Sequence, residues 1–153
     1  MVQIQVDQKA PAYAVREAYV NAPIQLVWNI LANLEKWPEW NDSVKAMDLQ
    51  GNVVPGTEFR WTAGGMKIRS RIEQVDPPRR IVWSGRTMGI RAMHSWTFAE
   101  EKEGTKVRTE ESFEGWIVKL LARKMKRALS EALEQGISAL KNEAEKRHRE
   151  IMA

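Results

Sequence analysis

Cysteine is absent from this chain of 153 residues, and histidine occurs only twice, as His94 and His148. The absence of cysteine excludes disulfide bonds, thiolate catalysis and cysteine-ligated zinc sites. The two histidines lie too far apart in the sequence to indicate a ligand cluster for a first-row metal. The sequence also lacks a glycine-rich phosphate loop and a nucleophile elbow. We therefore predict no metal and no other cofactor.

Long apolar segments are missing as well. No stretch approaches the roughly twenty apolar residues that cross a membrane, and the N-terminus carries no apolar run of the signal-peptide type. Because cysteine is also absent, the composition fits a reducing compartment, and we expect a cytoplasmic protein. The length is typical of one domain. We place that domain at residues 13–149, after an N-terminal arm or extra strand over residues 1–12.

The C-terminal quarter, from Trp116 to about Arg149, is predicted to be one long helix. Apolar residues recur there at helical spacing and form one stripe. The stripe consists of Val118, Leu121, Ala122, Met125, Leu129, Ala132, Gly136 and Leu140. The missing side chain of Gly136 leaves room either for close packing or for a bound molecule. Further along, Glu143 and Arg147 are spaced to form an ion pair, and we expect this end to extend beyond the sheet into solvent.

The net charge of +4 is concentrated in the same helix. Nine basic and five acidic residues occur from Trp116 onward, whereas the rest of the chain is balanced, and most of the excess lies between Lys119 and Arg127. Such a stretch is either a solvated helix face or a surface that contacts an anionic membrane or an acidic partner. Aromatic residues are not interleaved with it, apart from nearby Trp116. Nucleic acid is therefore not a predicted partner.

Upstream of the helix, short alternating segments predict an antiparallel sheet. Strands are expected at residues 13–21, 44–50, 57–63, 66–75, 80–85, 89–99 and 105–113. The Asn21-Ala22-Pro23 step opens a helix between the first two strands, and residues 34–40 form a second, short helix around Pro38. The alternation of apolar and polar residues along the strands indicates one covered face and one wet face.

Two tight turns determine the expected strand registers. Gly64-Gly65 is a two-residue hairpin signal, and it places Trp61 opposite Ile68. A later turn of four residues places His94 opposite Glu111. A slip of one residue would turn an apolar set of side chains toward water, so only a slip of two residues remains as an alternative.

Six groups of residues occur in a particular order between residues 13 and 145. They are Val20-Asn21-Ala22-Pro23 with Val27-Trp28, Trp37-Pro38-Glu39-Trp40-Asn41, Pro55-Gly56-Thr57, Trp83-Ser84-Gly85, His94-x-Trp96-x-Phe98 and Gly104-Thr105. This order resembles the START/SRPBCC superfamily, and most of all its polyketide cyclase/dehydrase-type branch. The resemblance implies an α+β helix-grip fold. In that fold a curved, seven-stranded antiparallel sheet surrounds a long C-terminal helix, with two short helices between the first two strands.

The resemblance also implies a deep, largely apolar cavity. Such proteins hold lipids, sterols, polyketides, quinones or plant hormones, and some of them catalyse cyclisation or dehydration. Seven tryptophans, against two tyrosines and three phenylalanines, indicate a lined cavity as readily as a tight core. The residues that we expect to bind a ligand are Trp37, Trp40, Phe59, Trp61, Ile68, Ser70, Trp83, His94, Trp96, Glu111, Phe113, Met125 and Gly136.

His94 and Glu111 are the candidate catalytic residues, because both are predicted to point inward from neighbouring strands. A carboxylate beside an imidazole raises the basicity of the ring and selects its tautomer. The pair could act as a general base on an acidic carbon, anchor a carbonyl or hydroxyl group of a ligand, or form a satisfied polar pair with a structural role.

Three functions are compatible with this sequence. The first is the binding, for carriage or sensing, of a small hydrophobic or aromatic molecule, including a lipid. The second is a cyclase/dehydratase-like enzyme, a lyase or isomerase, that uses His94 and Glu111 as an acid–base pair. The third is docking to an anionic membrane or an acidic partner through the basic stretch Lys119–Arg127.

Overall fold

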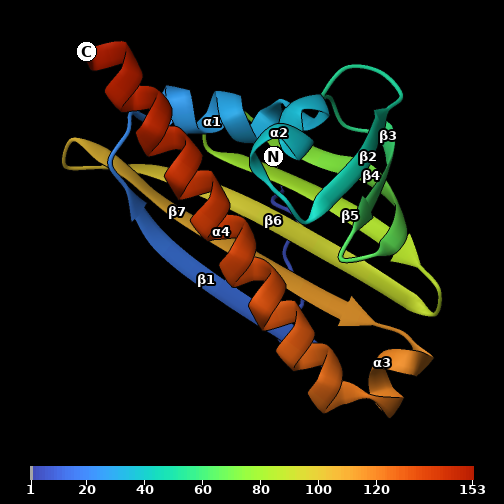
Figure 1. Cartoon of the computed structure of the whole chain (residues 1–153). Helices are drawn as coiled ribbons and strands as arrows, with labels where there is room; N and C mark the ends of the chain where they lie inside the picture. The colour runs from blue at the N-terminus through green and yellow to red at the C-terminus, as the bar shows by residue number, and fades with distance from the viewer. Residues whose placement is uncertain (1) are drawn as a thin grey trace.

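Seven antiparallel strands form one sheet, and a long C-terminal helix lies across one face of it in the computed structural model (Figure 1). The structure describes residues 2–153. The elements are β1 (Ala12–Val20), α1 (Ile24–Ala32), the 3₁₀ turn η1 (Leu34–Lys36), α2 (Trp37–Trp40), β2 (Val44–Leu49), β3 (Glu58–Ala63), β4 (Met66–Asp76), β5 (Arg80–Thr87), β6 (Ile90–Glu101), β7 (Gly104–Glu114), α3 (Trp116–Leu120) and α4 (Ala122–Met152). The strand order is β1-β7-β6-β5-β4-β3-β2. The helix-grip fold predicted from the sequence is confirmed.

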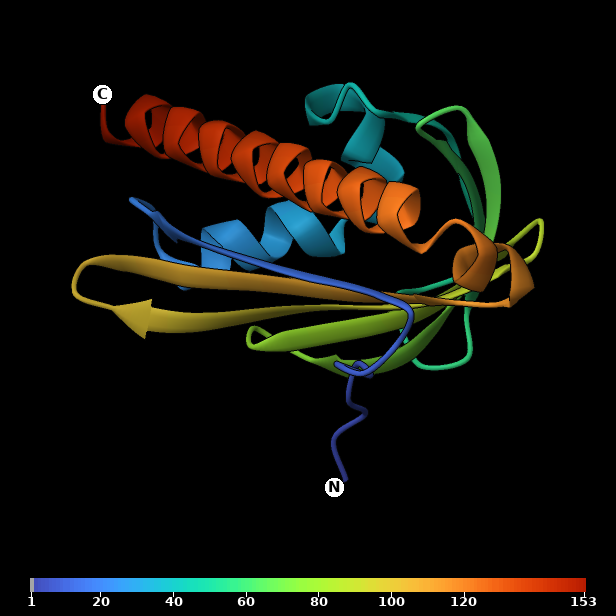
Figure 2. The same ribbon diagram turned by 90° about the horizontal axis from the view of Figure 1, so that it is seen from below.

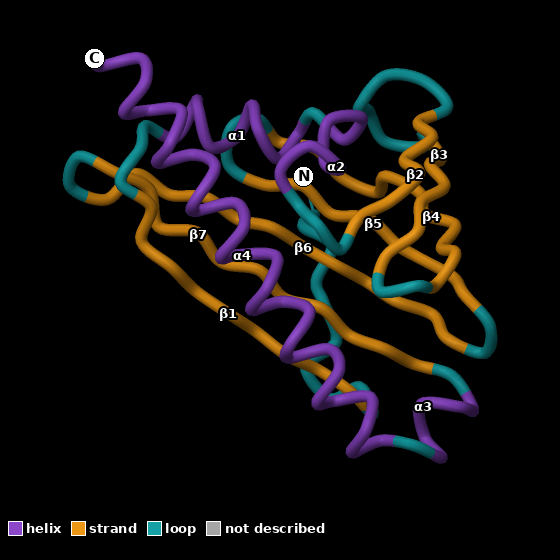
Figure 3. The backbone as a smooth tube through the Cα atoms, viewed as in Figure 1, coloured by secondary structure: helices purple, strands orange, loops and turns teal. Residues whose placement is uncertain are grey.

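Both predicted hairpin registers are confirmed. Trp61 of β3 pairs with Ile68 of β4 across the Gly64-Gly65 turn. The two glycines of this turn have φ values of 56° and 80°, a left-handed conformation that suits a two-residue hairpin. His94 of β6 pairs with Glu111 of β7. The tube in Figure 3 shows how consecutive hairpins bring these strands side by side.

The C-terminal helical segment is divided in two, so the prediction of one unbroken helix is wrong. Leu121 leaves the helical conformation, with φ −118° and ψ 38°, between α3 and α4. α3 therefore points away from the axis of α4 (Figure 1). The buried face of α4 includes Leu129, Gly136 and Leu140 of the predicted stripe but differs from the stripe elsewhere. Leu133 and Ile137 are buried, whereas Leu121 and Ala132 are exposed.

The far end of α4 stays packed against the domain for longer than expected. The predicted ion pair between Glu143 and Arg147 is present, with 2.6 Å between Oε2 and Nε. Ala144, between them in the sequence, is nevertheless fully buried. The helix itself continues to Met152.

The main apolar core lies between the sheet, α1 and α4. Figure 2 shows both helices on the same side of the sheet. Trp28 of α1 packs edge-on against Phe98 of β6, with 5.9 Å between the ring centroids. A second, smaller apolar cluster joins Ala12 and Ile90 to Leu129 and Leu133 near the start of α4. The sheet and α4 are therefore held together by apolar packing at both ends, and the space between the two clusters is where a cavity can exist.

The opposite face of the sheet is partly covered, so the prediction of one fully wet face is wrong. Residues 2–11 contain no helix or strand and run beneath the sheet (Figure 2). The buried guanidinium group of Arg80 donates to the carbonyl oxygen of Ile4, and the N–H of Ile4 donates to Oε1 of Gln74 at 3.0 Å. The arm thus supplies hydrogen-bond partners for Arg80, which alternation assigns to the outer face, and for Gln74, which a register shift after Ile72 turns to that face.

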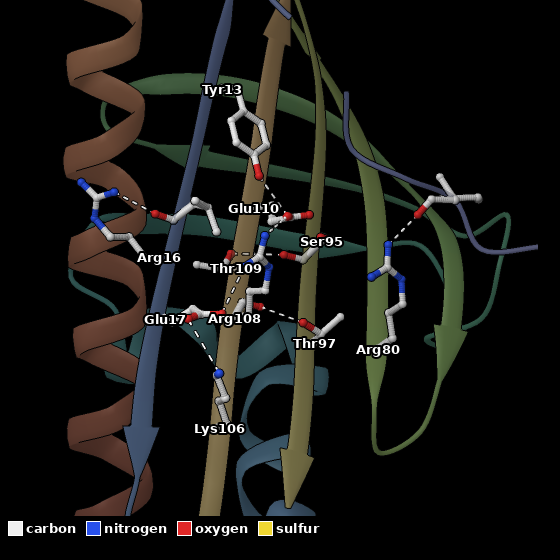
Figure 4. Close-up of polar contacts among 12 residues, drawn as sticks. Tyr13, Arg16, Glu17, Arg80, Ser95, Thr97, Lys106, Arg108, Thr109 and Glu110 are labelled. Atoms are coloured by element: carbon white, nitrogen blue, oxygen red, sulfur yellow. Dashed lines mark hydrogen bonds and ion pairs between the residues drawn. The ribbon is translucent and has the colours of Figure 1, made fainter. Parts of the chain in front are cut away.

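A charged network on the same outer face joins β1 to β7 (Figure 4). The hydroxyl of Tyr13 donates to Oε1 of Glu110 at 2.9 Å. Arg108 donates to the same carboxylate and also to Glu17, at 3.1 Å in the latter case. Glu110 and its neighbour Glu111 therefore face opposite sides of the sheet, and only Glu111 faces α4.

Two β-bulges interrupt the strand ladders. One extra residue occurs in β4 between Ile72 and Gln74. Another occurs in β2 between Lys45 and Asp48, where Ala46 has a positive φ of 51°. Bulges bend a strand and increase its local twist. The second bulge lies in β2, which forms one edge of the sheet.

Candidate functional site

A cavity of about 450 Å³ lies between the sheet and the first half of α4. Its walls come from α2, from strands β3 to β7 and from α4. Its rim lies between the β3–β4 turn, the end of β5 and α4. The rim is formed by the exposed lining residues Gly64, Met66, Arg86 and Glu131. This volume is in the range of sites that hold small organic molecules.

Small side chains on two facing surfaces leave the space open. Ser70, Gly85 and Ala92 are cross-strand neighbours on β4, β5 and β6. The helix α4 contributes the small residues Ala128, Ala132 and Gly136. A Cβ atom added to Gly136 would lie 3.9 Å from Cζ2 of Trp96, which is an ordinary contact. Gly136 therefore packs beside Trp96 and also lines the cavity.

Aromatic rings form a continuous wall along one side of the cavity. Trp37 lies next to Trp61 and Trp83, with centroid distances of 5.3 and 5.2 Å. His94 continues the row, 4.8 Å from Trp83 and 5.7 Å from Trp96. Edge-on and tilted arrangements of this kind favour a rigid wall, because each ring is held by its neighbours.

The indole N–H groups of this wall differ in their partners. Trp37 donates to the carbonyl oxygen of Leu31 at 2.8 Å, and Trp61 donates to Oγ of Ser70 at 3.1 Å. The Nε1 atoms of Trp40 and Trp96 are buried and have no hydrogen-bond partner among residues 2–153. Buried hydrogen-bond donors are nearly always paired with an acceptor. A hydrogen-bond acceptor placed beside either of these two N–H groups would therefore stabilise it.

His94 and Glu111 are the polar pair of the cavity. Nε2 of His94 lies 2.8 Å from Oγ1 of Thr109. The Thr109 hydroxyl donates to the carbonyl oxygen of Ser95 at 3.2 Å (Figure 4). Since the Thr109 proton is used in that bond, its oxygen accepts from His94, which places the ring proton on Nε2. Nδ1 is then an acceptor, and it lies 3.4 Å from Oε1 of Glu111.

Burial governs the protonation of both groups. It lowers the pKa of His94 to about 3 and raises the pKa of Glu111 to about 8. The direction for His94 is opposite to the increase in basicity that the sequence predicted from a neighbouring carboxylate. The reason is that Glu111 is itself protonated at neutral pH and carries no negative charge. The pair is therefore neutral, and the carboxyl group is a hydrogen-bond donor.

The structure brings most of the predicted ligand-binding residues together around this cavity. Those that line it are Trp37, Trp40, Trp61, Ile68, Ser70, Trp83, His94, Trp96, Glu111, Phe113 and Gly136. Two predicted residues lie elsewhere. Phe59 is fully buried behind the wall, against Trp37 and Trp61, and Met125 packs with the second apolar cluster. Binding roles for the lining residues remain predictions.

A polar group in the cavity wall was missed by sequence reasoning. The hydroxyl of Ser43 lies 2.8 Å from Oδ1 of Asn41 and 3.0 Å from Oε1 of Gln135, so its single proton is shared between the two acceptors. Gln135 donates to Oδ1 of Asn41 at 3.0 Å. These three residues tie the end of α2 to α4 and line the cavity. Their sequence positions offered a signal, because Asn41 directly follows a tryptophan-rich motif and Gln135 precedes Gly136.

Neither a cluster of metal ligands nor a membrane-spanning helix is found among the residues that the structure describes. Across residues 2–153, no three histidine, aspartate or glutamate side chains gather as a metal site requires. None of the helices described there combines the length and the apolar composition needed to cross a bilayer.

Comparison with known proteins identifies the family. The family model described as polyketide cyclase/dehydrase and lipid transport matches residues 12–145. Similar solved structures include a hypothetical protein from Helicobacter pylori, with 15% identity, a TM-score of 0.80, and coverage of 94% of this chain and 98% of that one. The Zhui aromatase/cyclase from Streptomyces sp. R1128 has 19% identity, a TM-score of 0.76 and coverage of 88% and 94%. A START superfamily protein from Mycobacterium smegmatis has 15% identity, a TM-score of 0.71 and coverage of 88% and 97%. These likenesses show a shared fold, while the family match spans nearly the whole domain, so the chain belongs to the polyketide cyclase/dehydrase and lipid transport family.

Proposed function

We propose that this protein binds a small, neutral, apolar or aromatic molecule for carriage or sensing. The observation that carries the proposal is the cavity of about 450 Å³, walled by aromatic rings around one buried polar pair. Small-molecule sites are usually concave and largely apolar, with a few polar groups that fix orientation. The description of the family, which includes lipid transport, supports the same function.

The charge state of the cavity favours an uncharged ligand. At neutral pH the His94–Glu111 pair has no net charge, because burial keeps the carboxyl group protonated and the imidazole neutral. The charged lining residues Arg86 and Glu131 are exposed at the rim. A ligand that carried its own charge into the buried part would lose hydration without gaining a counter-ion. A ketone, phenol or hydroxyl oxygen would instead accept from the carboxyl group of Glu111.

Tryptophan fluorescence provides the direct test. The purified protein would be titrated with a polycyclic phenol, a polycyclic ketone, a sterol and a fatty acid, because five tryptophans line the cavity and report on its contents. We expect saturable quenching by at least one of the neutral molecules. Native mass spectrometry would then give the stoichiometry of the complex. Absence of both quenching and bound mass across the panel would contradict a ligand-binding function.

The role of the polar pair is tested by the variant Glu111→Leu. Removing one donor should weaken the binding of an oxygen-bearing ligand by roughly fivefold, since a hydrogen bond contributes about 1 kcal/mol. A hydrocarbon of similar shape should bind equally to both proteins. Glu114→Gln is a matched control, because Glu114 lies on the same strand but outside the cavity. An equal loss of affinity for both ligands would show that Glu111→Leu changes the shape of the cavity and does not act by removing a hydrogen bond to the ligand.

Acid–base catalysis is the second candidate function. It is favoured by one specific observation, a protonated carboxyl group 3.4 Å from an unprotonated imidazole nitrogen in a largely apolar cavity. Glu111 would donate its proton to a carbonyl or hydroxyl oxygen of the ligand and would regain a proton from solvent when the product leaves. Nδ1 of His94, which carries no proton, would orient the carboxyl group by accepting its hydrogen bond until the ligand oxygen replaces it. This assigns the acid role to Glu111, whereas the sequence predicted His94 as the base.

The two functions separate on the variant Glu111→Gln. Glutamine keeps a hydrogen-bond donor of the same shape but has no proton to transfer. If the protein only binds, affinity should change little and no turnover of the ligand should be found. If it is a cyclase or dehydratase, turnover should fall by about 10² or more while affinity is retained. Unchanged turnover in the variant would eliminate Glu111 as the acid.

A further inference from the structure

One end of the molecule exposes large apolar side chains that nothing in the described chain covers. Met88 is 89% exposed, Trp116 is 70% exposed and Leu120 is 73% exposed. Met88 lies in the β5–β6 turn, and the other two lie on α3. We call these three residues the apolar tip. Exposed tryptophan and leucine side chains are seldom grouped on a protein surface. Such a group of apolar side chains marks an interaction site.

The apolar tip is held in place by a close backbone approach. A Cβ atom added to Gly115, just before α3, would lie on the carbonyl oxygen of Gly89, and Gly115 has a φ of 124°. A Cβ atom at Gly89 would in turn lie 3.2 Å from Nε1 of Trp116. Only glycine fits both positions. α3 is thus fixed against the β5–β6 turn, and both ribbon views show the two segments side by side (Figures 1 and 2).

The segment that carries the tip is strongly basic. Between Trp116 and Arg127 the chain has five cationic residues and no acidic one. They are Lys119, Arg123, Lys124, Lys126 and Arg127, and all five are exposed. Within residues 2–153 none of the five forms an ion pair. The break at Leu121 turns α3 away from α4, so that the apolar tip projects next to these free cations.

We infer that this end of the molecule docks on the surface of an anionic lipid bilayer. Tryptophan side chains favour the level of the lipid headgroups, and leucine and methionine favour the acyl chains just below it. Unpaired lysine and arginine side chains around them attract anionic headgroups. An acidic protein would be bound by the cations but has no need of three protruding apolar side chains, which is why we favour the bilayer.

The docking surface adjoins the rim of the cavity. Met88 directly follows the lining residues Arg86 and Thr87, and Arg127 directly precedes the lining residue Ala128. A docked molecule would therefore hold the rim close to the lipid headgroups. Transfer of a ligand between bilayer and cavity rests on the proposed function. Docking itself does not, because it uses none of the residues that face the cavity.

Vesicle co-sedimentation tests docking without any cavity ligand. The probes are vesicles of phosphatidylcholine alone and of phosphatidylcholine mixed with phosphatidylserine. We expect binding to the mixed vesicles at low salt, little binding to phosphatidylcholine alone, and weaker binding as salt rises. Failure to bind the mixed vesicles at low salt would overturn the proposal, whatever the cavity binds. Binding to an acidic protein with no vesicle binding would also overturn it.

Two double variants separate a specific surface from general attraction by a basic helix. Lys124→Gln with Lys126→Gln should weaken vesicle binding by about tenfold or more. Lys146→Gln with Arg149→Gln removes the same charge from exposed sites at the far end of α4 and should have a much smaller effect. Equal effects of the two pairs would contradict docking at this end.

The apolar tip is tested by Trp116→Ala with Leu120→Ala, which leaves the net charge unchanged. We expect at least tenfold weaker binding to mixed vesicles, since both side chains leave water on docking. Both residues are exposed, and circular dichroism should show that the fold is retained. Vesicles should shift the tryptophan fluorescence to shorter wavelength in the parent protein but not in the variant Trp116→Phe. This result would place Trp116 at the bilayer. Unchanged binding of the alanine double variant would overturn the insertion of the tip.

Discussion

Glu111 and His94 show how a buried pair of titratable residues can be uncharged. The geometry assigns the imidazole proton to Nε2, where Thr109 accepts it, and leaves Nδ1 facing the carboxyl group. Transfer of one proton between the two groups would create an ion pair without changing the total charge. Burial opposes that transfer, because separated charges lose more hydration than they regain from each other at 3.4 Å. The neutral form is therefore the one presented to a ligand.

This assignment makes stability depend on pH in a defined window. Between pH 4.5 and 8 native Glu111 holds a proton that the unfolded chain has lost, so the free energy of unfolding falls as pH rises. Between pH 3 and 6.5 His94 has the opposite effect, because only the unfolded chain is protonated. The two effects offset each other from pH 4.5 to 6.5. From pH 6.5 to 8 only Glu111 acts, and we expect a fall of about 2 kcal/mol at most, at about 1.4 kcal/mol per pH unit.

Urea denaturation across pH 6.5–8.5 measures this fall, with Glu111→Gln as the comparison. The variant cannot lose a proton at this position, so the difference in unfolding free energy between variant and parent should grow as pH rises. All other groups titrate in both proteins and cancel in the difference. Parallel pH profiles would mean that Glu111 is ionised in the native protein and that the neutral-pair assignment is wrong.

Gly136 supplies a second prediction for a single residue. Glycine inside a helix is about 1 kcal/mol less favourable than alanine. An alanine methyl group would lie 3.9 Å from the Trp96 ring, so there is room for it. We expect Gly136→Ala to raise the free energy of unfolding by up to about 1 kcal/mol, as measured by urea denaturation. A clear loss of stability would mean that the indole of Trp96 has to approach the helix more closely than it does here.

Among the elements, the β3–β4 hairpin depends on the backbone of its turn. Gly65 has a φ of 80°, and a Cβ atom added there would have no neighbour within 4 Å. The cost of Gly65→Ala should therefore come from backbone strain alone, at about 1 kcal/mol. Chemical denaturation would measure it. Gly65→Asn is the matched control, because asparagine tolerates the left-handed region, and it should lose less stability than alanine. Equal losses would point to a cause other than φ.

The helices show where a sequence pattern stops being informative. Periodicity extrapolated from Val118 through Leu121 assumed one continuous helix, whereas the helical conformation breaks at Leu121. Of the later stripe residues, Leu129 and Leu140 are buried as predicted, but Ala132 is exposed. No proline or glycine marks that break. Its cause is tertiary, since Gly115 and Gly89 hold α3 against the β5–β6 turn while α4 follows β1. A local pattern does not contain such a contact.

The strands were predictable in more detail, because their information is local. The Gly64-Gly65 signal was sufficient to place Trp61 opposite Ile68, and the later turn of four residues placed His94 opposite Glu111. Alternation also found Trp61, Trp83 and Trp96 of the cavity wall. It failed for two buried polar residues of the outer face. The arm that covers Arg80 is distant in sequence, and the bulge in β4 takes Gln74 out of the alternation. Phe59 was wrongly predicted to line the cavity, for a related reason. Alternation assigns a side chain to the inner face of the sheet, but it does not tell whether that side chain lies in the cavity wall or behind it.

At the scale of the whole molecule, the open cavity lowers stability, and filling it should reverse this. Ala132 lines the cavity from α4, and Ala132→Leu would place apolar atoms in the space. We expect the free energy of unfolding to rise by about 1 kcal/mol or more, by burial of added CH₂ groups, and ligand affinity to fall at least tenfold. Denaturation and fluorescence titration would measure the two effects.

The control for this prediction is Ala99→Leu, which adds the same side chain at an exposed position of β6 outside the cavity. It should change neither stability nor affinity by much. If Ala132→Leu leaves affinity intact, the ligand occupies another site. Stability–function trade-offs of this kind are common where a protein keeps an interior space for a partner.

The bulge in β2 has a consequence for how the protein behaves at high concentration. A free sheet edge is a template on which another chain can add a strand, which is the first step of many aggregation processes. In β2 the ladder slips between Lys45 and Asp48, and Ala46 turns out of the extended conformation. An incoming strand would find a short, bent and charged edge in place of a flat one. A protein with an internal cavity unfolds more readily than one with a filled core. The bulge protects this protein at a sheet edge where self-association would otherwise begin.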